Sequence, residues 1–136
     1  VVNLACERCT AGDVEKLQHM INLEQSAIDQ GDMATALRRS GEFHLQLAIV
    51  ARNQPFVHAL RGLISQTSLI ITMYSHGGGN ACARDEHSLL LAAVSAGDQH
   101  RAQQQMAHHL GHIAAGCDFT QSPQVANLKG AFAHLS

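Results

Sequence analysis

Apolar residues recur every three or four positions along most of the chain, which is the spacing of an amphipathic α-helix. Runs in which apolar and polar residues alternate, the pattern of a half-buried strand, are absent. The spacing predicts helices over about residues 1–9, 10–29, 33–51, 56–74, 83–96 and 98–116, and a short further helix over about 125–135. Because short turns join helices of similar length, the fold class is predicted to be all-α, an antiparallel bundle of about six to seven helices.

Cap signals separate the predicted helices. Thr10, with an aspartate three residues later, is the pattern of an N-terminal capping box. Gly31-Asp32 and Gly97-Asp98 each place a glycine, which tolerates the left-handed conformation at a helix end, before an aspartate that can cap the next helix. These signals favour short turns between neighbouring helices, and hence the antiparallel arrangement.

Length and composition restrict the class of protein. The 136 residues are enough for one domain with its own core, and 46% of them are hydrophobic against 15% charged, which excludes a disordered chain. No uninterrupted apolar run is long enough to span a bilayer, so no membrane partner is expected. The formal net charge is -2 and Lys and Arg form no cluster, so this chain is not expected to bind the phosphates of a nucleic acid.

Two features indicate a fragment of a longer cytoplasmic protein. The chain starts at Val1 within a helical run and has no signal-peptide layout. The Cys-x-x-Cys spacing of Cys6 and Cys9 lacks the second pair that a zinc site needs, so we interpret these residues as small, reduced thiols. Residues 1–117 are predicted to form the bundle, with its first helix truncated, and residues 118–136 a C-terminal tail that holds the short last helix.

Three histidines lie within the apolar stripes of three different predicted helices: His44, His87 and His109. A buried polar group without a partner costs about 1 to 3 kcal/mol, so three of them in one small domain need an explanation. Imidazole is the commonest metal ligand at neutral pH, and helical bundles build metal sites from side chains on facing helices. The spacing leaves two interpretations open, either three separately hydrogen-bonded core histidines or one metal ion shared by all three.

Short motifs around these histidines resemble a known family. They are Phe-His at His44, Glu-His at His87 and Met-x-x-His-Leu at His109, together with the segments 51–56 and 97–98 between them. In order and spacing, over about residues 1–116, the chain resembles the C-terminal ligand-binding domain, called FCD or FadR-C-terminal-like, of GntR-family transcription regulators. The resemblance implies a helical bundle that follows an N-terminal winged helix-turn-helix, here absent. It also implies a metal ion, zinc or nickel, bound by one Asp and three His, of which His44, His87 and His109 are the three.

The chain departs from the family pattern at one position. Metal-binding members usually carry Asp four residues before the first histidine, where this chain has Ser40. Glu42 is a poor substitute because it points to a different side of the helix from His44. The predicted ligands are therefore three neutral imidazoles, with water or a carboxylate in the open positions and Ser40 hydrogen-bonded to that water. A pocket of three histidines without metal is the alternative.

Four residues are candidates for contact with an effector: Ser40, Thr67, Arg84 and His112. Arg84 lies one turn before His87, so its guanidinium could clamp a carboxylate; a solvated arginine is the alternative. Thr67 lies on an apolar stripe and could offer a hydroxyl to a ligand or be a satisfied core residue. His112 lies one turn beyond His109 and could contact a ligand or support a metal ligand.

The resemblance implies an effector-sensing domain that binds a small organic acid at the three-histidine metal site and is not an enzyme. A homodimer is implied, and operator DNA would be bound only through the absent N-terminal domain. The alternative is a small zinc-dependent hydrolase, since three histidines with an open position also build hydrolytic zinc sites. Against a hydrolase, no general base is evident, because Glu42 and Glu86 are expected to face away from the metal.

Overall fold

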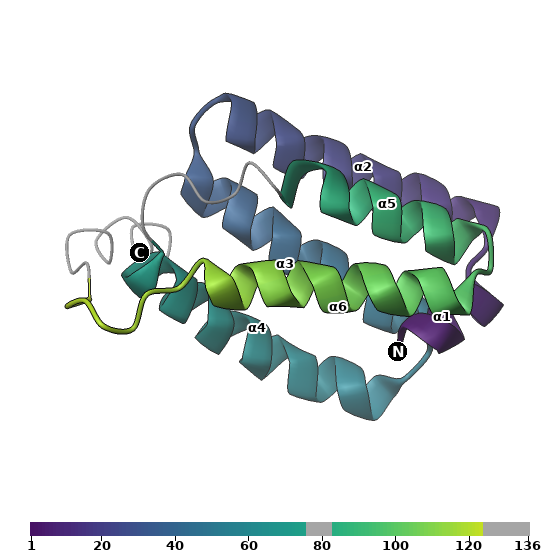
Figure 1. Ribbon diagram of the computed structural model, residues 1–136. Helices are drawn as coiled ribbons and strands as arrows, with labels where there is room; N and C mark the ends of the chain where they lie inside the picture. The colour runs from purple at the N-terminus through teal and green to yellow at the C-terminus, as the bar shows by residue number, and fades with distance from the viewer. Residues whose placement is uncertain (76–82, 124–136) are drawn as a thin grey trace.

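The computed structural model describes residues 1–75 and 83–123, apart from the side chains of residues 83 and 84. Its described residues form six helices and no strand, and an isolated bridge joins Ser75 to Cys117. Figure 1 shows the helices lying side by side as a bundle. They are α1 (Val2–Arg8), α2 (Ala11–Asp29), α3 (Met33–Val50), α4 (Gln54–Tyr74), α5 (Ala83–Ser95) and α6 (Gln99–Ala115). The all-α fold class is confirmed, whereas the predicted helix over 125–135 lies outside the described residues.

The helix boundaries follow the cap signals. Thr10 caps α2 by a complete capping box, in which its hydroxyl accepts the N–H of Asp13 and the Asp13 carboxylate accepts the N–H of Thr10. Gly31 and Gly97 have φ of 72° and 69°, the left-handed region expected for the residue that ends a helix. Each is followed by an aspartate that caps the next helix, so the turn predictions are confirmed.

The core lies between α2, α3, α5 and α6, with the short α1 packed across one end of α3, α5 and α6. In Figure 1, α2 and α5 run side by side, α3 lies between them and α4, and α6 crosses in front of α3. The largest apolar side chains that are fully buried are Leu17, Ile21, Phe43, Leu47, Leu90 and Val94. These residues come from three helices, so burying them together fixes how α2, α3 and α5 pack.

Helix α4 is apolar but lies at the margin of the bundle, and Val57 is its one fully buried described residue. The side chain of Leu63 is 52% exposed, although the apolar spacing of α4 predicts a stripe buried in the core. The difference arises because α4 packs mainly on α3 and lies away from α2 and α5. A Cβ at Gly41 of α3 would lie 2.6 Å from Ile64 Cγ2, so the two helices approach closely where glycine leaves room.

No helix among the described residues combines the length and the apolar character needed to cross a membrane.

Candidate metal centre

The three histidines of the sequence prediction meet at one point in the bundle. His44 comes from α3, His87 from α5 and His109 from α6. The Nε2 atoms lie 3.0 Å apart for His44 and His109, and 3.2 Å apart for each of the other two pairs. His87 is 0% exposed and His109 is 1% exposed, while His44 is half-buried. The three rings therefore lie together in the structure. The helical spacing of the sequence alone could not establish this.

Two buried glutamates hold the outer nitrogens of two of these rings. The Nδ1–H of His87 donates to Glu24 Oε2 at 2.6 Å, and the Nδ1–H of His109 donates to Glu86 Oε2 at 2.7 Å. These contacts assign the proton of each ring to Nδ1, so each Nε2 presents a lone pair. His44 can donate one proton at most, so hydrogen bonds alone leave at least one pair of Nε2 lone pairs facing each other. Such a contact is repulsive unless a cation lies between the nitrogens.

Burial lowers the pKa of two of the three histidines, His44 and His87. Desolvation, with His87 and His109 close by, holds the pKa of His44 well below its ordinary value. Desolvation, with His109 close by, likewise lowers the pKa of His87 to about 3. His44 and His87 are therefore neutral near pH 7, which is the form that binds a metal ion.

The two supporting glutamates differ in charge state. Burial raises the pKa of Glu24 to about 7, although the nearby His109 acts in the opposite direction. Burial also acts to raise the pKa of Glu86, but hydrogen bonds from His109 and His112 outweigh it and lower the value. Glu86 is therefore an anion near pH 7, whereas Glu24, with a pKa of about 7, accepts the Nδ1–H of His87 in its ionised form.

The donor set fits a divalent metal ion. Nitrogen ligands about 2.1 Å from one ion lie about 3.0 Å apart at octahedral angles and about 3.4 Å apart at tetrahedral angles. The three observed separations of 3.0 to 3.2 Å fall within this span. The described residues that could hold the ion are His44, His87 and His109, with Glu24 and Glu86 orienting two of the rings.

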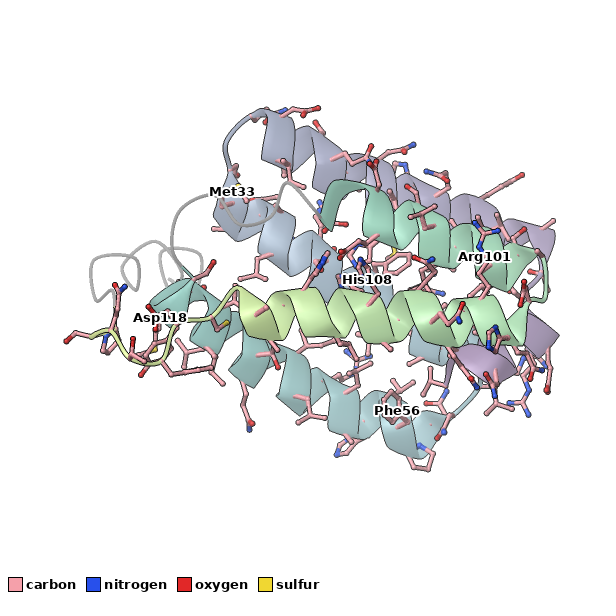
Figure 2. The ribbon with its side chains drawn as sticks, in the orientation of Figure 1. Met33, Phe56, Arg101, His108 and Asp118 are labelled. Atoms are coloured by element: carbon pink, nitrogen blue, oxygen red, sulfur yellow. The ribbon has the colours of Figure 1, made fainter. Side chains whose placement is uncertain are left out.

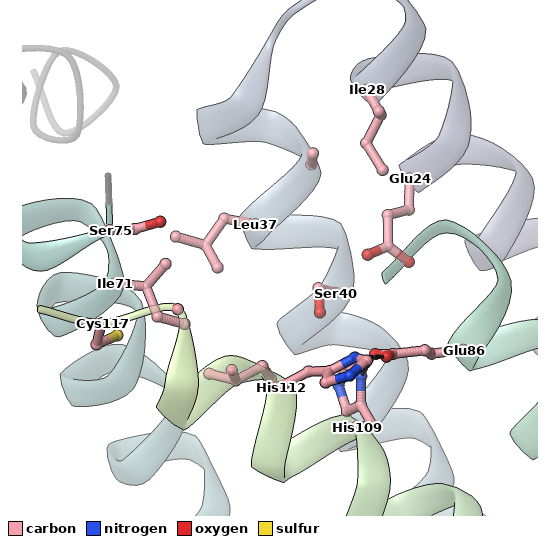
Figure 3. Close-up of a pocket in the computed structure, with 13 residues that line it drawn as sticks. Glu24, Ile28, Leu37, Ser40, Ile71, Ser75, Glu86, His109, His112 and Cys117 are labelled. Carbon is pink, nitrogen blue, oxygen red and sulfur yellow. Dashed lines mark hydrogen bonds and ion pairs between the residues drawn. The ribbon is translucent and has the colours of Figure 1, made fainter. Parts of the chain in front are cut away.

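Cavities lie on two sides of the histidine cluster. The smaller has a volume of about 60 Å³ and is shown in Figure 3, where Glu86, His109 and His112 lie below Ser40 and Glu24 faces them from α2. The larger, of about 410 Å³, lies between α3, α4 and α6. Its lining includes His44, Ser40 and Thr67, but most of it is apolar, including Leu47, Phe56, Leu60, Leu63, Ile64, Ile71, Met106, Leu110 and Ile113.

The predicted effector residues lie at different places around these cavities. Ser40 lines both of them, one turn before His44 on α3. Thr67 lines the larger cavity from α4, and His112 lines the smaller one. His112 also donates from Nδ1 to Glu86 Oε1, so it supports the residue that orients His109. The side chain of Arg84 lies outside the described part of the chain.

The roles of both glutamates were not predicted from the sequence. Glu24 occupies the apolar stripe of α2, one turn after Ile21, and a carboxyl group on a buried stripe is a signal that could have identified it. Glu86 was expected to face away from the metal, and its contact with a ligand histidine was not predicted. Glu86 does accept the Nδ1–H of His109, because α5 packs directly against α6.

Comparison with known proteins places the chain in a family. The model of the FCD domain family matches residues 1–112. The solved structure of E. coli McbR/YncC is similar, with a TM-score of 0.68 and 22% sequence identity. The match covers 84% of this chain and 58% of that one, so the chain spans little more than half the length of its structural neighbour. No curated protein matches the chain. The motifs, the helical architecture and the family match agree, and the chain belongs to the FCD domain family.

Proposed function

We propose that this chain is the effector-sensing domain of a GntR-family transcription regulator, with a divalent metal ion, zinc or nickel, bound by His44, His87 and His109. The family assignment supports a regulatory, non-enzymatic domain. The observation that carries the metal proposal is the cluster of three Nε2 atoms within 3.2 Å of one another, two of them with lone pairs assigned by glutamate partners. Neutral imidazoles in this arrangement match the preference of zinc and nickel for nitrogen ligands.

The effector in this proposal is a small carboxylate with an apolar body. The ion, when bound, would offer open positions to the carboxylate, since three protein ligands do not fill its coordination shell. Three histidines bring no negative charge to the ion, so an anionic ligand would balance it. The large cavity reaches His44 and is lined mainly by apolar side chains, with Ser40, Thr67 and Ser68 as its hydroxyl groups. A ligand body that lacks further charges suits this lining.

Signal transfer would use the position of α4. One wall of the large cavity is α4 and the opposite walls are α3 and α6, so an occupant contacts α4 as well as the metal-binding helices. A ligand can shift a conformational equilibrium only if it binds one arrangement better than another. In this proposal the effector favours one position of α4, and a homodimer of the cytoplasmic regulator transmits the change to winged helix-turn-helix domains outside this chain.

The experiment is a thermal-shift series on the purified chain, stripped of metal and then supplied with Zn²⁺ or Ni²⁺ and a panel of aliphatic and aromatic monocarboxylates. We expect the metal to raise the melting temperature, and an acid to raise it further only when metal is present, because a ligand of the folded state stabilises it by mass action. His87→Gln should abolish the metal-dependent stabilisation by the acid, while the exposed His100→Gln control retains it. Acid stabilisation that is equal with and without metal would contradict the proposed metal-linked site.

The zinc-dependent hydrolase gains no support from the site. Within the described residues, the two carboxyl groups nearest the cluster, Glu24 and Glu86, contact the Nδ1 atoms and not the Nε2 side, where an ion would lie. A general base must reach the water that it activates, and neither group is held in that position.

A further inference from the structure

Glu86 joins the inner histidine cluster to a second group of ligands at the surface. Its Oε2 accepts the Nδ1–H of His109, while its Oε1 accepts the Nδ1–H of His112 and lies 3.8 Å from His108 Nε2. The side chain of Glu86 is 6% exposed, and it is held as an anion between these three rings. One carboxylate therefore presents one oxygen to the interior and the other towards solvent.

The surface histidines are spaced as a chelating pair. His108 and His112 are four residues apart on α6, their ring centroids are 4.1 Å apart, and the potential ligand atoms of the group all lie within 4.8 Å of one another. Two histidines at this spacing on one helix face are a known arrangement for binding zinc. Their side chains are 59% and 44% exposed, so an ion can reach them from solvent. Figure 2 shows His108 on the side of α6 nearest α5, the helix that carries Glu86.

We propose that Glu86, His108 and His112 form a second divalent-cation site, open to solvent and distinct from the three-histidine site. Two imidazoles and a carboxylate favour Zn²⁺, Ni²⁺ or Cu²⁺ over Mg²⁺ and Ca²⁺, which prefer sites made wholly of oxygen. The site holds three protein ligands at the surface, so it binds more weakly than a closed structural zinc site.

Metal binding at this site needs one rearrangement that balances its protons. The Nδ1 of His112 exchanges its proton contact with Glu86 Oε1 for the metal, and the ring remains neutral because its proton moves to Nε2. Glu86 Oε2 keeps the Nδ1–H of His109. The two sites then share Glu86, and a cation on Oε1 withdraws electron density from the group that orients His109. Binding at one site therefore changes affinity at the other by the same factor in both directions.

The test is Zn²⁺ stoichiometry by equilibrium dialysis and calorimetry on the full chain. We expect two Zn²⁺ per wild-type chain, one for His108→Ala, and two for the control His100→Ala, which removes an exposed histidine of the same helix that lies outside the group. Because His108 is exposed, its substitution should leave the helical circular dichroism spectrum unchanged. The same number of bound ions in wild type and His108→Ala would overturn the proposal.

Failure of this site is distinguishable from failure of the inner one. His44→Ala removes a ligand of the inner site only, so it should retain the weaker of the two binding steps, whereas His108→Ala should retain the stronger. If wild type binds one ion and His108→Ala binds none, the surface site stands and the inner metal site is wrong. Glu86→Gln, which keeps the shape of the side chain but not its charge, should weaken both steps.

Discussion

The two sides of helix α3 are built differently. On the side of α2 and α5, apolar residues such as Ile21, Leu90 and Val94 are wholly buried, and the ring of His87 lies 4.4 Å from the ring of the buried Phe43. On the side of α4, apolar residues of a similar kind, such as Leu63, remain half exposed around a cavity of about 410 Å³. Close packing holds ligand atoms at fixed separations, and loose packing leaves volume for an occupant. We infer that the closed side positions the metal ligands and the open side receives the effector.

The matched pair Leu90→Ala and Leu63→Ala should separate the two sides most strongly. Leu90 is 0% exposed, so truncation leaves a cavity and should lower the free energy of unfolding by about 2 to 5 kcal/mol. Leu63 already lies half in solvent, and its loss should cost less than about 1 kcal/mol. Urea denaturation of the metal-free chains measures both values. Equal losses would mean that α4 is as much a part of the core as α5.

A second pair tests the contact by which α4 is attached to α3. Gly41→Ala places a methyl group 2.6 Å from Ile64 Cγ2 and should destabilise the chain by about 1 to 3 kcal/mol. Gly62→Ala on α4 meets no atom within 4 Å and should stabilise the helix by about 0.5 to 1 kcal/mol. Thermal unfolding reports both. If Ile64→Ala fails to restore stability to Gly41→Ala, the close approach of α3 and α4 is not the cause.

Removing the charge of Glu24 tests the support that the closed side gives to the metal site. Glu24→Gln keeps a hydrogen-bond acceptor near His87 Nδ1 but removes the carboxylate, and it should weaken Zn²⁺ binding at the inner site by about 10-fold to 100-fold. Competition with a chromophoric chelator, in a His108→Ala background, measures this site alone. The comparable change on the open side, Thr67→Val, should leave Zn²⁺ affinity unchanged and alter only the response to carboxylates.

The free energy of unfolding of the metal-free chain should also depend on pH, with a smaller effect than the substitutions above. The pKa of His87 is lowered to about 3 in the folded chain and is about 6.5 in an unfolded one, so the unfolded chain binds more protons between these values. Stability contributed by His87 is therefore complete above about pH 6.5 and is lost as pH falls, at up to about 1.4 kcal/mol per pH unit.

Glu24 acts in the opposite direction in that pH range. Its raised pKa of about 7 means that the folded chain takes up a proton there, so its contribution falls as pH rises from about 4.3 to 7. Urea denaturation between pH 5 and pH 7 should thus show a steeper acid loss in Glu24→Gln than in wild type. A steeper loss in wild type would mean that the buried carboxyl keeps its charge.

The sequence predicted the helices well because their limits are local. Thr10, Gly31 and Gly97 act on backbone groups within a few residues, so their effects on the helix ends can be predicted from the sequence. The exposure of the apolar side chains of α4 could not be predicted from the sequence. An apolar stripe indicates that a helix face is suited to burial, but it does not say which neighbour covers that face.

The metal centre, too, could be predicted from the sequence only in part. His44, His87 and His109 were identifiable by their place in apolar stripes and by family motifs, but their common point depends on how three helices pack. Glu24 lies 63 positions from its partner His87, and only the packing of α2 on α5 brings them together. Glu86 contacts His109 although it was expected to face away from the metal, because the packing of α5 on α6 brings its carboxylate to the Nδ1 side of that ring.

The most direct measurement is X-ray absorption at the metal edge of the Zn²⁺-loaded chain, in a His108→Ala background that leaves only the inner site. We predict three imidazole ligands with nitrogen about 2.0 to 2.1 Å from the ion, falling to two when His44→Ala is added. A spectrum with fewer than three imidazoles in the starting chain, or one unchanged by His44→Ala, would contradict the central claim that these three rings bind one metal ion.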